Sequence, residues 1–168
     1  MSMLLLASCG SRLSSEGKKV FSYNESNGIT SLDPAFTRNL ENMWAVNQLF
    51  DGLVELDSAM NVQALIAKSW DIAEDGLSYT FHLREDVLFH PHKLFTDSLS
   101  RRVVASDFVY SFNRIVDSEI ASPGSWVFKN IDFQNNGGFV AIDENTLQIN
   151  LIEPFPPFLG MLAMQYCN

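Results

Sequence analysis

The chain has 168 residues, of which 46% are hydrophobic and 18% are charged. A chain of this length and apolar content can bury a sizeable core, so intrinsic disorder is not expected for most of it. The 11 Lys and Arg residues stand against 20 Asp and Glu residues, which gives a formal net charge of −9. This excess of negative charge disfavours a nucleic-acid partner, because binding to a phosphate backbone depends mainly on basic side chains.

The N-terminal residues contain a short apolar run that ends in a cysteine. The run over residues 3–7 is far shorter than the roughly 20 apolar residues that a membrane-spanning helix needs. Leu6-Ala7-Ser8-Cys9 resembles a bacterial lipobox, in which the cysteine thiol carries the lipid. We therefore interpret residues 1–8 as part of a lipoprotein signal, Cys9 as the lipidation site and residues 9–17 as a tether. The alternative is a short apolar terminus with an incidental cysteine. If Cys9 is acylated, Cys167 remains a buried thiol without a disulfide partner.

The first elements expected along the chain are a strand and a helix. Residues 18–23 predict a short strand, and Asp33-Pro34 interrupts the chain after it. Residues 40–50 predict a helix that ends at Gly52, because five apolar side chains fall in one sector at helical spacing. These side chains are Leu40, Met43, Trp44, Val46 and Phe50. Asn47 falls in the same sector, which favours a buried hydrogen bond over a ligand contact for its side chain.

The middle of the chain predicts two hairpins and a helix. Residues 53–56 predict a strand, and residues 69–84 predict a hairpin because apolar and polar residues alternate around Glu74-Asp75-Gly76. Residues 107–117 predict an amphipathic helix, residues 139–151 a second hairpin, and residues 158–166 the start of another apolar helix. We expect an α+β unit in which six alternating side chains pack against helix 107–117. They are Tyr79, Phe81, Leu83, Leu147, Ile149 and Leu151.

Signatures of catalysis and of nucleotide binding are missing from the sequence. The nine glycines are scattered rather than clustered in a phosphate-binding loop, and neither a Gly-x-Ser-x-Gly nor a His-Glu-x-x-His motif occurs. His90-Pro91-His92 with Asp97 could bind a metal and leaves a metal-assisted enzyme as a distant alternative. Two imidazoles beside a proline are more typical of a polar hairpin rim than of a closed four-ligand site. We therefore expect no catalytic residue, no metal site and no cofactor.

Five segments, in order and at similar spacing, resemble the family 5 extracellular solute-binding proteins, which are dipeptide and oligopeptide receptors of bacterial ABC importers. The segments are SLDPAF at 31–36, LFDGLVELD at 49–57, AKSWDIAEDGLSYTFHLREDVLFH at 67–90, ASDFVYSFNRIVD at 105–117 and IDENTLQINLIEPFPPFL at 142–159.

The resemblance implies an α+β fragment of a type II periplasmic-binding-protein fold, in which two lobes enclose a peptide by hinge closure. Residues 18–52 are then the first strand and helix of lobe I, residues 53–157 an inserted α+β subdomain, and residues 158–168 a return into lobe I. Family members are much longer than this chain, so the second lobe is expected to be absent. A groove with one wall buries less of a ligand, and we expect peptide binding by this chain alone to be weak or lost.

The resemblance also implies which residues line the peptide. The stretch after the Asp-Pro runs beside the bound peptide as an added strand in the family, and this role falls on Arg38, Asn39, Leu40 and Glu41. The alternative for these residues is a helical first turn with solvated charges. A second contact in the family is an aromatic residue directly after a Ser-Pro pair. Here Gly124 follows Ser122-Pro123, and Trp126 is expected to reach the same space.

The partners implied are a peptide ligand, the permease and ATPase subunits of an ABC importer, and a membrane that holds the lipid of Cys9. The expected location is the extracytoplasmic or periplasmic face of that membrane. A second hypothesis is a structural remnant that folds but no longer captures solute.

Overall fold

The computed structural model describes residues 22, 24–25, 27–97 and 99–168. Cys9, the tether and almost all of the strand expected at 18–23 lie outside the described residues. Within the described part, no helix combines the length and the apolar composition needed to cross a membrane.

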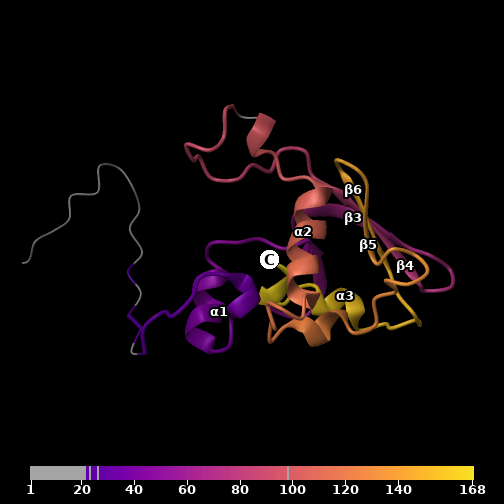
Figure 1. Cartoon of the computed structure of the whole chain (residues 1–168), viewed down its shortest axis with the longest axis horizontal. Coiled ribbons are helices and arrows are strands. Elements are labelled where there is room, and N and C mark those ends of the chain that lie inside the picture. Colours follow the sequence, from indigo (N-terminus) through magenta and orange to yellow (C-terminus); the bar gives the residue numbers. More distant parts are fainter. Residues whose placement is uncertain (1–21, 23, 26, 98) are drawn as a thin grey trace, which may run out of the picture.

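A four-stranded antiparallel sheet forms one side of the fold, at the right of Figure 1, with helix α2 beside it. In spatial order its strands are β3 (Ala67–Ile72), β4 (Ser78–Leu83), β6 (Thr146–Asn150) and β5 (Phe139–Asp143). Tyr79 pairs with Ile149 and Phe81 pairs with Leu147 across β4 and β6. Directly paired residues of an antiparallel sheet share a face, so the alternating apolar residues of the two strands form one apolar face.

The two hairpins end in turns that their own side chains stabilise. Gly76 has a φ of +69°, a conformation that glycine adopts without steric cost, and the adjacent Asp75 Oδ1 accepts a hydrogen bond from the N–H of Leu77 at 2.9 Å. In the β5–β6 turn, Asp143 Oδ1 accepts from the N–H of Asn145 at 2.8 Å. Such aspartate turns are encoded locally, which explains why both hairpins could be predicted.

Helix α2 (Ala105–Val116) packs against β5 and β6 on the apolar face of the sheet (Figure 1). It begins two residues earlier than expected, where Asp107 Oδ2 accepts a hydrogen bond from the N–H of Val104 at 2.8 Å. Phe108, Phe112 and Ile115 form its buried stripe, and the Phe112 ring lies 4.9 Å from Phe128 and 5.3 Å from Phe139, centroid to centroid. The expected packing is confirmed, because all six side chains assigned to this core are buried: Tyr79, Phe81, Leu83, Leu147, Ile149 and Leu151.

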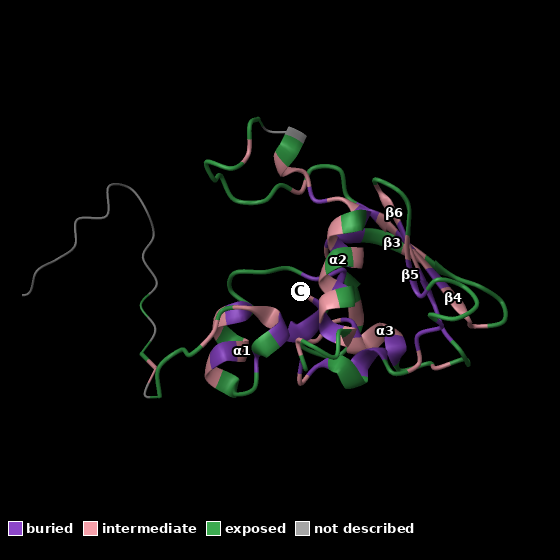
Figure 2. Cartoon of the chain, in the orientation of Figure 1, coloured by how far each residue is buried: buried purple, intermediate pink, exposed green. Residues whose placement is uncertain are grey.

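Helix α1 (Leu40–Val46) differs from the helix expected over residues 40–50. It ends four residues earlier, and Leu40 and Trp44 are 61% and 53% exposed instead of packed. Figure 2 shows exposed, intermediate and buried segments side by side on α1. Val46 alone of the five apolar residues is buried, because a helix of two turns directs only a narrow strip of its surface inward. Asn47 is also exposed, and its Oδ1 accepts a hydrogen bond from Asn168 Nδ2 at 3.0 Å. The expectation of a buried Asn47 was therefore wrong.

The remaining elements are a two-stranded ribbon and the C-terminal helical turns. Strands β1 (Val54–Leu56) and β2 (Val62–Ala64) form an antiparallel ribbon joined by a turn at residues 57–61. The apolar run expected as one helix over 158–166 is divided into α3 (Phe158–Met161) and the 3-10 turn η4 (Gln165–Cys167). Cys167 is free and buried as expected, and burial raises the pKa of its thiol.

Candidate functional site

The segment that follows the Asp-Pro pair is fixed to α2 by an ion pair. Asp33 begins the 3-10 turn η1 (Pro34–Phe36), where its Oδ1 accepts a hydrogen bond from the N–H of Ala35 at 3.0 Å. Arg114 of α2 donates to both carboxylate oxygens of Asp33, from Nη2 to Oδ2 at 2.8 Å and from Nη1 to Oδ1 at 3.3 Å. The two residues lie 81 positions apart in the chain. This bidentate geometry fixes Asp33, which lies shortly before the expected ligand-lining residues in the chain.

The ion pair shifts the pKa of each partner in the direction that favours its charged form. Hydrogen bonding from Arg114 is the main cause that lowers the pKa of Asp33, and burial opposes it. The same hydrogen bond raises the pKa of Arg114. Both side chains remain about one-third exposed, at 34% and 31%, so solvent weakens the attraction between them.

The residues expected to line the peptide span the entry into α1. Arg38 and Asn39 precede the helix, whereas Leu40 and Glu41 form its first turn. The backbone is extended at Thr37 (φ −66°, ψ 120°) and at Asn39 (φ −127°, ψ 162°). The stretch therefore combines extended backbone at the buried Thr37 and the exposed Asn39 with a helical turn at 40–41, a mixture of the two conformations considered for it.

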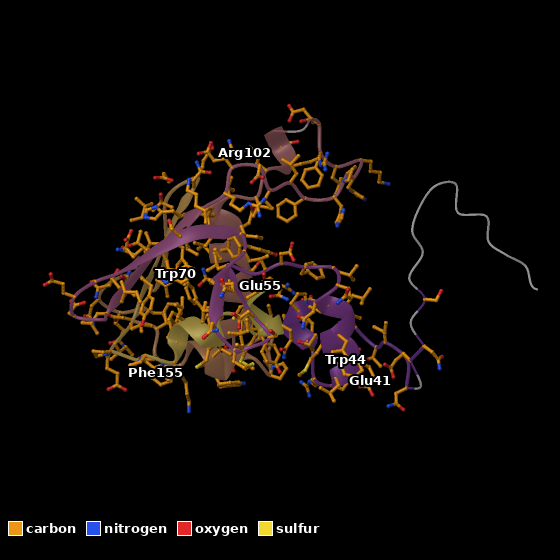
Figure 3. The ribbon with its side chains drawn as sticks, turned by 180° about the vertical axis from the view of Figure 1, so that it is seen from behind. Glu41, Trp44, Glu55, Trp70, Arg102 and Phe155 are labelled. Atoms are coloured by element: carbon orange, nitrogen blue, oxygen red, sulfur yellow. The ribbon has the colours of Figure 1, made fainter. Side chains whose placement is uncertain are left out.

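Side-chain hydrogen bonds hold this entry in place. Asn39 Oδ1 accepts from the N–H of Asn42 at 3.1 Å, and Glu41 Oε1 accepts from Asn27 Nδ2 at 2.6 Å. Figure 3 shows Glu41 and Trp44 projecting together from the outer side of α1. Arg38, Asn39 and Leu40 are exposed, so their surface is accessible in the described part of the chain.

Sequence reasoning missed the residue that ties α1 to the segment before it. Asn42 is buried, its Oδ1 accepts from the N–H of Thr30 at 3.0 Å, and its Nδ2 donates to Thr30 Oγ1 at 2.9 Å. The available signal was a polar residue one turn after Asn39, but its partner lies 12 positions upstream. No local pattern identifies such a pair.

Gly124 lies against an aromatic ring from the C-terminal turn. It is buried, and a Cβ atom at this position would overlap the ring of Tyr166. The ring of Tyr166 thus requires the absence of a side chain at 124. Trp126, in the 3-10 turn η3 (Ser125–Phe128), is 48% exposed. The aromatic residue that contacts Gly124 is therefore Tyr166, while the ligand contact expected of Trp126 stays a prediction.

The expected site residues occupy two separate places. Asn39 caps α1 and Glu41 accepts a hydrogen bond from Asn27 in the segment before it, whereas Gly124 packs on Tyr166 of η4. The two places are linked indirectly, because η4 lies against η1, which precedes Arg38. A cavity of about 460 Å³ lies between Asp33, α2 and residues 87–95, and it is not lined by Arg38–Glu41, Gly124 or Trp126.

Two of the residues considered for a metal, His92 and Asp97, form local hydrogen bonds. His92 Nδ1 accepts from the N–H of Leu94 at 3.3 Å, and Asp97 Oδ1 accepts from the N–H of Ser100 at 2.8 Å. Among the described residues, no three His, Cys, Asp or Glu side chains form a group suited to a metal ion.

The first prediction concerns the ion pair between Asp33 and Arg114. Asp33→Asn lowers the free energy of unfolding by about 1 kcal/mol at neutral pH, because a partly exposed bidentate pair is lost. The pKa of Asp33 is lower in the folded state than its ordinary value of 3.8, so the stabilisation is complete above that value and is lost as the pH falls through the folded-state pKa. Urea unfolding at neutral and acidic pH measures both effects. Asp86→Asn, which removes an exposed Arg84–Asp86 pair, is the control and has a smaller effect; a larger effect than that of Asp33→Asn contradicts the prediction.

The second prediction concerns Gly124. Gly124→Ala lowers the free energy of unfolding by about 1–3 kcal/mol, because the new methyl group overlaps the ring of Tyr166. The cost decreases when Tyr166→Ala removes the ring, which a double-mutant cycle of urea unfolding measures. Additive effects of the two substitutions would show that the contact is not the cause.

Comparison with known proteins places the chain in a family. The model described as bacterial extracellular solute-binding proteins, family 5 Middle, matches residues 61–167. Heme-binding protein A of Haemophilus influenzae is 37% identical over 128 residues, which are 72% of this chain and 23% of that protein. The periplasmic oligopeptide-binding protein OppA of Escherichia coli is 32% identical over 158 residues, which are 87% of this chain and 27% of OppA.

A solved structure agrees with these relatives. The peptide-bound OppA of Listeria monocytogenes superimposes with a TM-score of 0.73 at 28% identity, over 84% of this chain and 28% of that one. The chain thus spans about a quarter of the length of the proteins that it matches. The expected α+β fragment of a type II periplasmic-binding-protein fold is confirmed, and these relatives are named as binding proteins. Because the family model matches more than half of the chain, the protein belongs to family 5 of the bacterial extracellular solute-binding proteins.

Proposed function

We propose that the chain serves as the peptide-binding component of an ABC importer on the extracytoplasmic side of the membrane, with permease and ATPase subunits as partners. The observation that carries this proposal is the superposition on a peptide-bound relative over most of the chain. Relatives carry names that refer to haem as well as to peptides. An accessible extended stretch of backbone favours a peptide, because main-chain hydrogen bonds recognise peptides whatever their side chains.

The peptide-contacting strip in this proposal is Arg38, Asn39, Leu40 and Glu41. Main-chain pairing is available at the exposed Arg38 and Asn39, whereas Leu40 and Glu41 begin α1 and contribute side chains. The Asp33–Arg114 pair and the cap at Asn39 hold this edge before any ligand arrives. A preorganised edge loses less conformational entropy on binding.

Gly124 and Trp126 form the second part of the proposed site. Trp126 is an exposed aromatic surface on which a ligand side chain can pack, and Gly124 lets Tyr166 approach the backbone beside it. The proposed organisation assigns residues 18–52 and 158–168 to lobe I and residues 53–157 to an inserted subdomain.

The strip is one wall of a binding site in this proposal. Arg38, Asn39 and Leu40 are exposed in the described part of the chain, so a peptide that lies there stays in contact with water on its other side. Hydrogen bonds in contact with water contribute little net free energy. The 168 residues by themselves are therefore proposed to bind peptide weakly.

The third prediction tests the strip through its backbone. Within the described residues the N–H of Arg38 donates no hydrogen bond, and Thr37 before it already has the extended conformation that proline requires of its predecessor. Arg38→Pro removes this donor and weakens the binding of trialanine about fivefold, the effect of one net hydrogen bond. Arg38→Ala retains the donor and is the matched control. Titration of the amide NMR spectrum with millimolar trialanine measures affinity and location together.

The expected shifts lie at residues 37–41 and 124–126. Equal weakening by Arg38→Ala and Arg38→Pro would show that the side chain and not the backbone contacts the peptide. Shifts confined to other residues, or no shift at all, would contradict the proposed strip.

The fourth prediction concerns Cys9, which lies outside the described residues. We propose that its thiol carries lipid, because the preceding Leu6-Ala7-Ser8 matches the small residues of a lipobox. Cys9→Ala moves the protein from the membrane fraction to the aqueous fraction when it is expressed in a bacterium with lipoprotein-processing enzymes, since acyl chains contribute about 0.8 kcal/mol per buried methylene. Cys167→Ala leaves the distribution unchanged. Membrane attachment that survives Cys9→Ala rejects lipidation as the anchor.

A further inference from the structure

The cavity beside α2 has the size and the walls of a small-molecule site. Its volume of about 460 Å³ falls in the range of roughly 300–1,000 Å³ that is typical of ligand pockets. Residues 49–51 and residues 87–90 with Phe95 line the cavity. Asp107, Ser111 and Arg114 of α2 line it as well. Asn168, marked C in Figure 1, lies at its edge.

The apolar part of the lining is rich in aromatic rings. Phe50, Phe89, Phe95 and Phe108 all contribute, and the rings of Phe89 and Phe95 are stacked with centroids 6.1 Å apart and planes at 11°. Arg101 fixes the backbone of Phe89, because it donates to the Phe89 carbonyl oxygen from Nη2 at 2.6 Å and from Nε at 2.8 Å. The faces of such rings attract cations electrostatically, in addition to packing against apolar groups.

The charged part of the lining is negative. Asp33, Asp51 and Asp107 line the cavity together with a single guanidinium, that of Arg114, which is already paired with Asp33. Asp51 and Asp107 are therefore the carboxylates available to a ligand in the described lining. A cation is favoured over an anion in such a site.

The side chain of Asp107 has only one hydrogen-bond partner within the described residues. Its Oδ2 accepts one hydrogen bond, from the N–H of Val104, and no other hydrogen bond or ion pair reaches the side chain within the described residues. Burial raises its pKa above the ordinary value although that hydrogen bond opposes the shift. Burial destabilises the ionised form of Asp107, and a positive group beside it would stabilise that form.

We propose that this cavity binds a small organic cation, a primary ammonium on an aromatic or aliphatic body, with the ammonium against Asp107 and the body between the phenylalanine rings. This site goes beyond the proposed peptide strip, because none of Arg38–Glu41, Gly124 and Trp126 lines it. The ammonium comes either from a free amine or from the N-terminus of a peptide. Both present the same group to Asp107.

The fifth prediction uses phenethylammonium as the probe and the whole chain as the protein. Asp107→Asn keeps an acceptor for the N–H of Val104 and nearly the same size, but it removes the charge, and it weakens phenethylammonium binding at least about tenfold in isothermal titration. Asp117→Asn, at the other end of α2 and outside the cavity lining, leaves the affinity unchanged. The neutral analogue 2-phenylethanol binds the original chain more weakly than phenethylammonium does, and Asp107→Asn does not weaken it further.

Each other outcome decides against the proposal. Equal affinity for 2-phenylethanol and phenethylammonium means that the cavity takes an apolar molecule and not a cation. Retained affinity in Asp107→Asn, equal loss in Asp117→Asn, or no measurable binding of phenethylammonium removes the assignment. An amide NMR spectrum of Asp107→Asn that is unchanged beyond the start of α2 shows that a loss of binding does not come from unfolding.

A comparison with the dipeptide Phe-Ala identifies the source of the ammonium. Tighter binding of Phe-Ala than of phenethylammonium assigns the cavity to peptide N-termini, and the reverse order assigns it to free amines. Because the strip is tested with trialanine and a backbone substitution at residue 38, either proposal can fail without the other.

Discussion

The packing of α2 on the sheet positions the residues that line the cavity and hold Asp33. Phe108, Phe112 and Ile115 are buried in the stripe toward the core, with Phe112 between Phe128 and Phe139. The residue before each of them is polar: Asp107, Ser111 and Arg114. Successive helical positions are rotated by about 100°, so burying the apolar stripe necessarily directs this polar row to the side of the helix. The row lines the cavity and carries the guanidinium that holds Asp33.

That constraint connects the core to the surface proposed to bind peptide. Arg114 fixes Asp33, Asp33 begins η1, and η1 leads through the buried Thr37 into the extended edge before α1. The edge is thus connected to the core through these contacts, even though the side chains of Arg38 and Asn39 are exposed. A binding surface held in this way can use main-chain hydrogen bonds without first ordering a loop.

The cavity and the strip have different chemistry, which argues for different roles. The strip offers extended backbone with mixed charges at Arg38 and Glu41, which suits a peptide main chain of any sequence. The cavity offers aromatic rings and a half-buried carboxylate, which suits one compact positive group. The Asp33–Arg114 pair lies at the boundary of the two, so a ligand in the cavity would contact the residues that position the strip.

Sequence patterns alone determined the two hairpins, helix α2 and the burial of six core side chains, because alternation, helical spacing and aspartate or glycine turns act among near neighbours. The family resemblance supplied the fold and the location of the strip, but not its conformation, which is extended at Thr37 and Asn39 and helical from Leu40. Only the tertiary structure decided that Leu40 and Trp44 are exposed, that Tyr166 occupies the space beside Gly124, and that Asp33 meets Arg114. These outcomes depend on segments far apart in the chain packing at one place, and residue spacing along a single element carries no information about which distant surface will cover it.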